Sequence, residues 1–177
     1  MGIHELKDVR TATPADAAEL ADHVNAAYRG ESSRAGWTTE ADLIEGARTT
    51  RESLAQEMAL PNRLFEILRD ADGKILASVQ LVRESSTCYL GMLTVRPTQQ
   101  GGGIGKSFLA HSEAVAREWG CVRIRMTVIN VRKELIAYYE RRGYARTGVE
   151  IPFHGDPRFG GMQKVDFKMI ELAKTIL

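Results

Sequence analysis

The sequence predicts an α+β fold, in which helices flank a mixed, mostly antiparallel sheet of about seven strands with one parallel crossover. Three observations support this fold class. Short segments of alternating apolar and polar residues, bounded by turn formers, are typical of strands and recur from residue 62 onward. Longer segments with apolar residues at helical spacing lie before and between them. After residue 89 a strand, a glycine-rich loop, a helix and a further strand follow one another, which predicts the parallel crossover.

The first third of the chain is predicted to be mostly helical. Pro14 stands at a first helical position, where its missing amide has no partner to lose, and Thr13 before it is a favourable N-cap. Thr38 or Thr39 is expected to cap a second helix. In chain order we expect a strand at 9–12, a helix at 14–28, a loop at 29–36, a helix beginning near Glu40 and a further helical piece at 51–60.

The rest of the chain is predicted to alternate between strands and helices. Apolar and polar residues alternate from Val122 to Val128, which is typical of a half-buried strand. Gly143 is suited to the left-handed position that ends a helix. The expected elements are strands at 64–68, 75–82 and 89–95, a helix at 104–119, a strand at 122–128, a helix at 132–142, and strands at 144–151 and 165–172.

Composition and charge disfavour several classes of function. A length of 177 residues predicts one domain, spanning residues 1–177. The formal net charge of +1 provides no overall field for nucleic acid or an anionic membrane. The two cysteines form no C-x-x-C pair and the histidines lack metal-like spacing, so we expect no metal. Because no apolar segment suggests a signal peptide or a membrane span, we expect a cytoplasmic protein without nucleic-acid or membrane partners.

The clearest functional signal is the segment Gln100-Gly101-Gly102-Gly103-Ile104-Gly105-Lys106, which precedes a predicted helix. Consecutive glycines lose much backbone entropy on folding, and they allow the backbone to approach a ligand closely. A helix N-terminus presents unpaired amides and a partial positive charge, and Lys106 adds a full charge. The segment therefore predicts a phosphate-binding loop. A tight turn without a ligand is the alternative interpretation.

Two common nucleotide motifs do not fit this loop. A P-loop requires a glycine where this sequence has Gln100, although Gly105-Lys106-Ser107 fits the end of that motif. The dinucleotide pattern G-x-G-x-x-G would place Lys106 or Phe108 where its last glycine belongs. A P-loop nucleotide hydrolase is therefore disfavoured.

A different signature fits this region. Val95-Arg96-Pro97 followed by Gln100-x-x-Gly103-x-Gly105 resembles the coenzyme A signature of the GNAT N-acetyltransferase superfamily. The strand ending at Asn130 and the segment Tyr138-Tyr139-Glu140-Arg141-Arg142-Gly143-Tyr144 resemble the family's second motif, with a somewhat longer gap between Asn130 and the tyrosines. The resemblance implies a three-layer α/β/α fold, acetyl-CoA as the acyl donor, and direct attack of an amine on the thioester.

The resemblance also implies roles for individual residues. It implies cofactor contacts for Leu93, Thr94, Val95, Gln100, Gly101, Gly102, Gly103, Ile104, Gly105, Lys106 and Asn130, with the pyrophosphate on the glycine loop and the pantetheine arm along the strand. Tyr139 is implied as the acid for the departing thiolate. Its neighbour Tyr138 points about 100° away on a helix, so only one of the two faces a cleft squarely. Tyr139 is favoured because it lies four residues before Gly143.

The acceptor side is less defined by the sequence. Trp37, Tyr89 and Glu134 are candidate substrate residues, although each also has a structural explanation, as a packing residue, a core residue or a partner of the helix dipole. Arg48 and Arg132 are candidates for binding an acceptor carboxylate, although arginines are more often solvated. We expect transfer of an acetyl group to a primary amine of a small molecule or peptide. A coenzyme A-binding sensor without activity is the alternative, and the resemblance also makes a homodimer possible.

Overall fold

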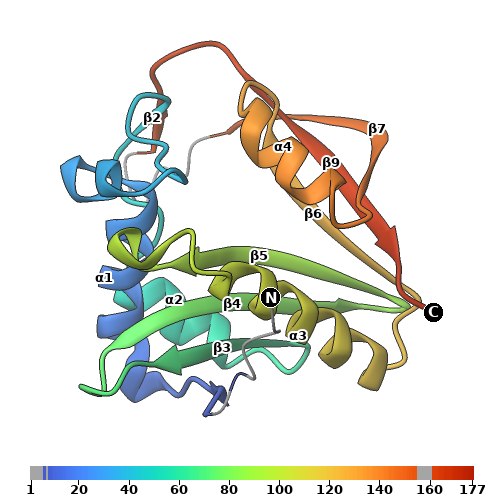
Figure 1. Cartoon of the computed structure of the whole chain (residues 1–177), viewed down its shortest axis with the longest axis horizontal. Helices are drawn as coiled ribbons and strands as arrows, with labels where there is room; N and C mark the ends of the chain where they lie inside the picture. Colours follow the sequence, from blue (N-terminus) through green and yellow to red (C-terminus); the bar gives the residue numbers. More distant parts are fainter. Residues whose placement is uncertain (1–5, 7, 155–160) are drawn as a thin grey trace.

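The computed structural model describes residue 6, residues 8–154 and residues 161–177, and its main sheet has seven strands (Figure 1). The spatial order of the strands is β1-β3-β4-β5-β6-β9-β7. All neighbours are antiparallel except β5 and β6, so the predicted fold class with one parallel crossover is confirmed. The strands are β1 (Arg10–Thr11), β3 (Arg63–Arg69), β4 (Ile75–Glu84), β5 (Thr87–Val95), β6 (Arg123–Ile129), β7 (Ala145–Pro152) and β9 (Lys168–Thr175).

Helices cover both faces of this sheet. The helices are α1 (Ala17–Tyr28), α2 (Arg51–Met58), α3 (Ile104–Glu118) and α4 (Lys133–Glu140), with 3-10 turns η1 (Pro14–Asp16), η2 (Glu31–Ala35) and η3 (Pro97–Gln99). Phe65 and Ile67 of β3 pack in one apolar cluster with α1 and α2, whereas Leu64 and Leu68 pack in another with α3 and α4. Because alternate side chains of a strand point to opposite faces, the two clusters lie on opposite sides of the sheet. The expected three layers are therefore confirmed.

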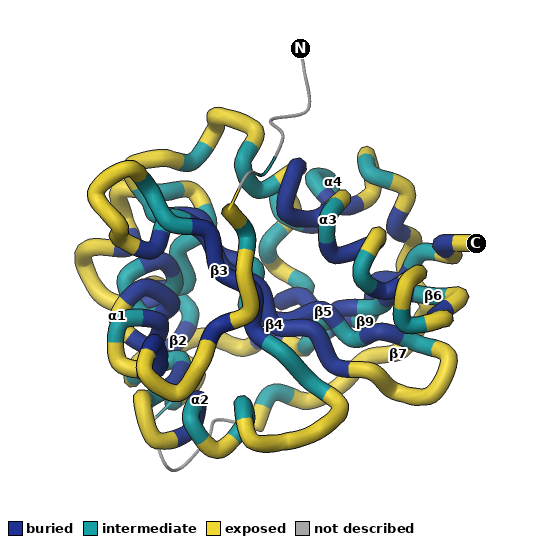
Figure 2. Tube along the Cα trace, turned by 90° about the horizontal axis from the view of Figure 1, so that it is seen from below, coloured by how far each residue is buried: buried dark blue, intermediate teal, exposed yellow. Residues whose placement is uncertain are grey.

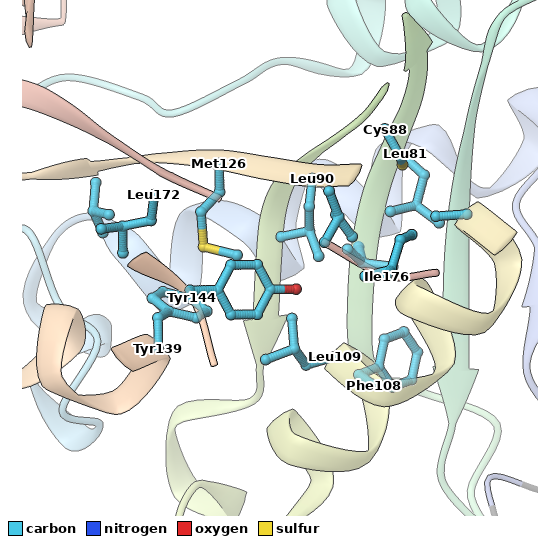
Figure 3. Packing of buried hydrophobic residues seen from close by; sticks show 14 of the residues in the cluster. Leu81, Cys88, Leu90, Phe108, Leu109, Met126, Tyr139, Tyr144, Leu172 and Ile176 are labelled. Atoms are coloured by element: carbon cyan, nitrogen blue, oxygen red, sulfur yellow. The ribbon is translucent and has the colours of Figure 1, made fainter. Parts of the chain in front are cut away.

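The larger of the two clusters joins the two halves of the sheet. Phe108 and Leu109 of α3 belong to the same apolar cluster as Leu81 of β4, Met126 of β6 and Leu172 of β9 (Figure 3). Figure 2 shows that buried residues follow the central strands, while β7 at the edge is exposed along its length. Burial of these apolar side chains is the main term that stabilises the fold.

The prediction of a helix beginning near Glu40 is wrong. One turn forms, in which the amides of Leu43 and Ile44 donate to the carbonyl of Glu40, and the chain then enters strand β2 (Ile44–Glu45). This strand pairs with β8 (Met162–Gln163) in a separate two-stranded sheet. Ile44 is buried in a cluster with Ile129 and Phe167, and this long-range packing overrides the local helix signal.

Some expected boundaries also shift. The last strand spans residues 168–175 rather than 165–172, because Asn130 at the end of β6 exchanges hydrogen bonds with Lys168 and sets where β9 begins. Val122 was expected on the buried face of its strand, but it precedes β6 and is 41% exposed. In the described ranges, no helix is long and apolar enough to cross a membrane.

The feature that creates a site is the separation of β5 from β6. The two strands pair only between residues 87–89 and 123–125, and beyond this point they diverge (Figure 1). Strand β5 also changes register against β4 between Ser78 and Gln80, where Met92 adopts a positive φ of 47°. An extra residue of this kind bends a strand and increases its twist. The second half of β5 therefore has an open edge on its β6 side within the described part of the chain.

Candidate active site

A cavity of about 560 Å³, called the first cavity below, lies between the open end of β5, the glycine loop and α4. Its volume falls within the range of roughly 300–1,000 Å³ that is usual for small-molecule sites. Its lining combines backbone of the glycine loop with aromatic and cationic side chains. The lining residues include Trp37, Thr38, Leu93, Val95, Gln100, Gly101, Gly103, Ile104, Gly105, Lys106, Glu134, Leu135, Tyr138, Tyr139, Arg141 and Arg142.

The glycine loop delivers the first turn of α3 to this cavity. Gly103 is the N-cap of α3 with a φ of 89°, a left-handed conformation that glycine adopts without a steric penalty. The first amides of a helix have no partner within it, and here they belong to residues 104–106, which line the cavity. Gly105 is in close contact with α4, since a Cβ there would lie 3.3 Å from the hydroxyl of Tyr138. Helix N-termini with unpaired amides of this kind can bind anions, and the phosphate-binding role of the loop stays a prediction.

Gln100 holds three segments together at the mouth of this loop. Its Nε2 donates to Thr38 Oγ1 at 2.8 Å and to the carbonyl of Val95 at 3.0 Å. Its Oε1 accepts a hydrogen bond from the amide of Trp37 at 2.9 Å. A Cβ at Gly36 would lie 2.5 Å from that oxygen, so this contact requires a glycine. The side chain of Gln100 is thus engaged within the protein, and it fixes the start of the glycine loop.

Trp37 lies over the first cavity, on the side of the glycine loop. Its ring packs on Tyr138 with centroids 5.4 Å apart. The guanidinium of Arg142 lies 3.5 Å from the centroid of the Tyr138 ring and donates to the carbonyl of that residue. With Lys106, Arg132 and Arg141, four cationic side chains line this cavity. We did not assign Arg141 and Arg142 from the sequence, although their place after the tyrosines at the end of a helix was a usable signal.

A smaller cavity of about 200 Å³, the second cavity, lies on the other side of α4's first turns. It is bounded by the end of α1, the middle of β5 and the end of β6. Its lining residues include Tyr28, Arg29, Glu40, Ile44, Arg48, Tyr89, Gly91, Met92, Leu93, Thr127, Ile129, Arg132, Leu135, Tyr139, Phe153 and His154. Tyr28, Leu93, Arg132, Leu135 and Tyr139 line both cavities, which therefore meet at these residues.

Tyr139 stands at this junction, whereas Tyr138 lines the first cavity alone. The helix thus separates the two tyrosines as their spacing implied. Tyr139 is only 7% exposed, and its ring packs on Tyr144 with centroids 5.8 Å apart (Figure 3). Burial raises the pKa of the Tyr139 phenol well above its usual range, and Tyr28 and Tyr138 add to this effect. The phenol therefore stays protonated and is available as a hydrogen-bond donor.

Tyr28, the last residue of α1, is a junction residue that sequence reasoning missed. Its hydroxyl donates to the carbonyl of Leu93 at 2.7 Å and so anchors α1 to the bulged part of β5. Burial raises the pKa of Tyr28 to about 12. No local pattern distinguishes this tyrosine from an ordinary residue at the end of a helix, because its partner lies 65 positions away in the chain.

The remaining residues that were predicted to contact the cofactor differ in whether they line a cavity. Thr94 is buried and its hydroxyl bonds that of Ser78, so its side chain points away from the first cavity, while Leu93 and Val95 line that cavity. Asn130 accepts a hydrogen bond from the amide of Lys168 at 3.1 Å and lines neither cavity. Gly102 lines neither cavity as well, and its cofactor role, like that of Asn130, stays a prediction.

Of the three candidate substrate residues, Tyr89 alone lines the second cavity. Its hydroxyl lies 3.3 Å from Thr127 Oγ1, and Arg125 lies over its ring. Trp37 and Glu134 line the first cavity instead. Within the described ranges, no group of three or more His, Cys, Asp or Glu side chains is arranged to hold a metal ion.

Comparison with known proteins agrees with this geometry. The profile of the Acetyltransferase (GNAT) family matches residues 22–144. The mycothiol acetyltransferase of Beutenbergia cavernae is 30% identical over 94 residues. That match covers 52% of this chain and 32% of the relative, so the chain spans about a third of the relative's length.

Solved structures show the same fold. One is the PaiA N-acetyltransferase of Thermoplasma acidophilum in complex with coenzyme A, with a TM-score of 0.65 and 17% identity over 95% of this chain and 98% of that one. Another is the ribosomal-protein-S18-alanine N-acetyltransferase of Escherichia coli, with a TM-score of 0.69 and 15% identity over 96% of this chain and 93% of that one. At these identities the similarity establishes the fold alone.

Proposed function

Because the chain belongs to the GNAT acetyltransferase family, we propose that it transfers the acetyl group of acetyl-CoA directly to a primary amine of a small molecule or peptide. The observation that carries this proposal is the meeting of two cavities at Tyr139 and Leu93. One cavity has the anion-binding loop that a pyrophosphate needs, and the other offers a separate space for the amine. Donor and acceptor would then meet in one ternary complex at the junction.

The donor is proposed to occupy the first cavity. The amides of residues 101–106 and the ammonium of Lys106 would bind the pyrophosphate, while Arg141 and Arg142 add positive charge nearby. The pantetheine arm carries amides, which would pair with the open edge of β5 around Leu93 as an added strand does. A structural neighbour with the same fold was solved in complex with coenzyme A, which supports coenzyme A as the ligand of this fold.

The chemistry at the junction involves no covalent enzyme intermediate. The amine nitrogen forms a bond to the thioester carbonyl carbon, the carbon–sulfur bond breaks, and the sulfur leaves with the electron pair. An amide at the open edge of β5 would stabilise the carbonyl oxygen that gains charge. Tyr139 keeps its proton because its pKa is raised. We propose that it donates a hydrogen bond to the developing thiolate, and that proton transfer to sulfur is coupled to loss of a proton from the attacking amine.

A thiol-release assay tests this function. The purified chain is incubated with acetyl-CoA and a panel of primary amines, and free coenzyme A is measured together with the mass of the acetylated product. We expect release that depends on both the protein and an amine. Tight coenzyme A binding in calorimetry without turnover of any amine would contradict the proposal and support a binding-only module.

A further inference from the structure

The second cavity has an unusual balance of charge. Its charged lining side chains are three arginines and one glutamate: Arg29, Arg48, Arg132 and Glu40. They come from four separate segments, namely the end of α1, the turn before β2, the loop after it and the start of α4. Such a concentration of like charge in a cavity is unfavourable unless an anion balances it.

Glu40 balances only part of this charge. It lies between two arginines, bonding Arg29 through one oxygen and lying 3.4 Å from Arg132 Nη1 through the other. The side chains of Arg29 and Arg132 are only 9% and 8% exposed, so water screens them poorly. The Nε of Arg29 is buried without a hydrogen-bond partner among the described residues. A buried donor of this kind is costly unless a ligand satisfies it.

Arg48 adds a further positive charge, and the backbone of this residue is held in place. The Oδ1 of Asn25 in α1 accepts a hydrogen bond from the amide of Arg48 at 2.7 Å, and its Nδ2 donates to the carbonyl of Thr49 at 2.9 Å. The guanidinium of Arg48 forms no ion pair with a carboxylate in the described ranges. Burial lowers the pKa of Arg29, and the nearby charge of Arg48 adds to this lowering. Among the described residues, the guanidinium of Arg48 thus has no carboxylate partner in this cavity.

Building on the proposed function, we propose that the acceptor is a small free amino acid, whose carboxylate is bound by Arg48 and Arg29 while its amine points to the junction at Tyr139. Guanidinium groups bind carboxylates through paired hydrogen bonds, which fixes both position and orientation. The volume of about 200 Å³ is below the usual range for drug-sized ligands, so it favours a small acceptor. The same three arginines repel cationic acceptors such as polyamines.

Matched acceptors test this specificity. Initial rates are measured with the twenty standard L-amino acids, their carboxamides, their decarboxylated amines, spermidine and dipeptides, at saturating acetyl-CoA. We expect at least one amino acid with a KM about tenfold or more below that of its carboxamide, since hydrogen bonds to a charged group contribute about 1.5–3 kcal/mol. A dipeptide should react poorly because its carboxylate lies too far from its amine. Equal KM values for acid and carboxamide, or a preference for spermidine or dipeptides, would overturn the inference.

Variants then assign the role to Arg48. Arg48→Gln should raise the KM for the preferred amino acid about tenfold, with little change in kcat and none in the KM for its carboxamide. Arg48→Lys should restore part of the affinity. Arg51→Gln is the matched control, because Arg51 is exposed at the start of α2 and should change neither constant. A similar KM increase for acid and carboxamide in Arg48→Gln would indicate a purely structural role and overturn the inference.

Calorimetry separates this inference from the proposed function. Amino acids and carboxamides are titrated into the protein saturated with coenzyme A, which requires no turnover. Binding of an amino acid but not of its carboxamide would support the inference even if no acetyl transfer occurred. Turnover of amines without discrimination for a carboxylate would leave the proposed function standing and overturn this inference alone.

Discussion

The two cavities are built in different ways. The lining of the first includes one contiguous stretch, residues 99–101 and 103–106, which brings the unpaired amides at the start of α3 to the cavity. The rest of its lining comes from β5, from α4 with its flanking residues, and from residues 28, 37 and 38. The second is formed by side chains from at least five segments that are distant in the sequence, and its polar groups are guanidinium, carboxylate and phenol rather than backbone. Under the proposed function, this difference fits the two substrates, because pyrophosphate is a constant part of the donor and would suit backbone amides, whereas the acceptor would be recognised by side chains.

This comparison predicts that a substitution at the junction affects both halves of the reaction. The largest expected effect is that of Tyr139→Phe, which removes the hydroxyl shared by the two cavities. We expect kcat to fall about 100-fold or more, as for loss of a general acid, while the Kd for coenzyme A is nearly unchanged. Tyr138→Phe is the control, because that hydroxyl lies in the first cavity alone. A wild-type kcat in Tyr139→Phe would remove this residue from the proposed role.

A substitution in the glycine loop should affect the first cavity alone. Gly103→Val places a branched side chain at a φ of 89° and crowds the amides that follow. We expect the Kd for coenzyme A, measured by calorimetry, to rise about tenfold or more, since αL strain costs about 1–2 kcal/mol and anion access is lost as well. Gly73→Val imposes similar strain at a φ of 75° in the turn between β3 and β4. That control should lower Tm but keep the coenzyme A affinity, and an equal loss of affinity in both variants would argue against a local role.

Loss of the hydrogen bond between Tyr28 and Leu93 should have a moderate effect on both cavities. Tyr28→Phe removes a buried hydrogen bond, so we expect the free energy of unfolding to fall by about 1 kcal/mol. We also expect kcat/KM to fall a few-fold, because the bulged part of β5 loses its anchor. Tyr89→Phe, whose hydroxyl has a longer contact of 3.3 Å with Thr127, should have less effect on both quantities. Identical denaturation curves for wild type and Tyr28→Phe would show that this bond contributes nothing.

The smallest effect is expected outside both cavities, where His111 of α3 bonds Glu66 of β3. This bond raises the pKa of His111. A histidine whose pKa is raised in the folded state stabilises the protein below its unfolded pKa of about 6.5, and this contribution is lost as pH rises through the folded value. His111→Gln should therefore lower Tm more at about pH 5.5 than at about pH 9, as measured by thermal denaturation at both pH values. It should not change the rate of acetyl transfer. A Tm difference that grows with pH would contradict this sign.

Sequence patterns within short segments predicted those parts of the candidate site that a single short segment forms. The glycine loop, the helix behind it and the separation of Tyr138 from Tyr139 follow from glycine conformation, helix dipoles and helical spacing. The helix expected near Glu40 failed because Glu40 bonds Arg29 and the chain after it is buried against Ile129. The structure shows the side chain of Gln100 bound to Trp37, Thr38 and Val95 at the first cavity, and its contact with the cofactor stays a prediction.

By itself, the sequence determined the fold class, the order of strands and helices around the crossover, and the position of the glycine loop at the start of α3. These features depend on periodicity and on glycines within a short segment, so the residues that cause them are neighbours in the chain. Only the tertiary structure decided which residues line the second cavity. The end of α1 packs against the bulged part of β5, at the point where β5 separates from β6. This packing brings together side chains that are distant in the sequence: Tyr28, Arg29, Glu40, Arg48, Arg132 and Tyr139. Such contacts depend on the packing of distant elements, which no short segment encodes.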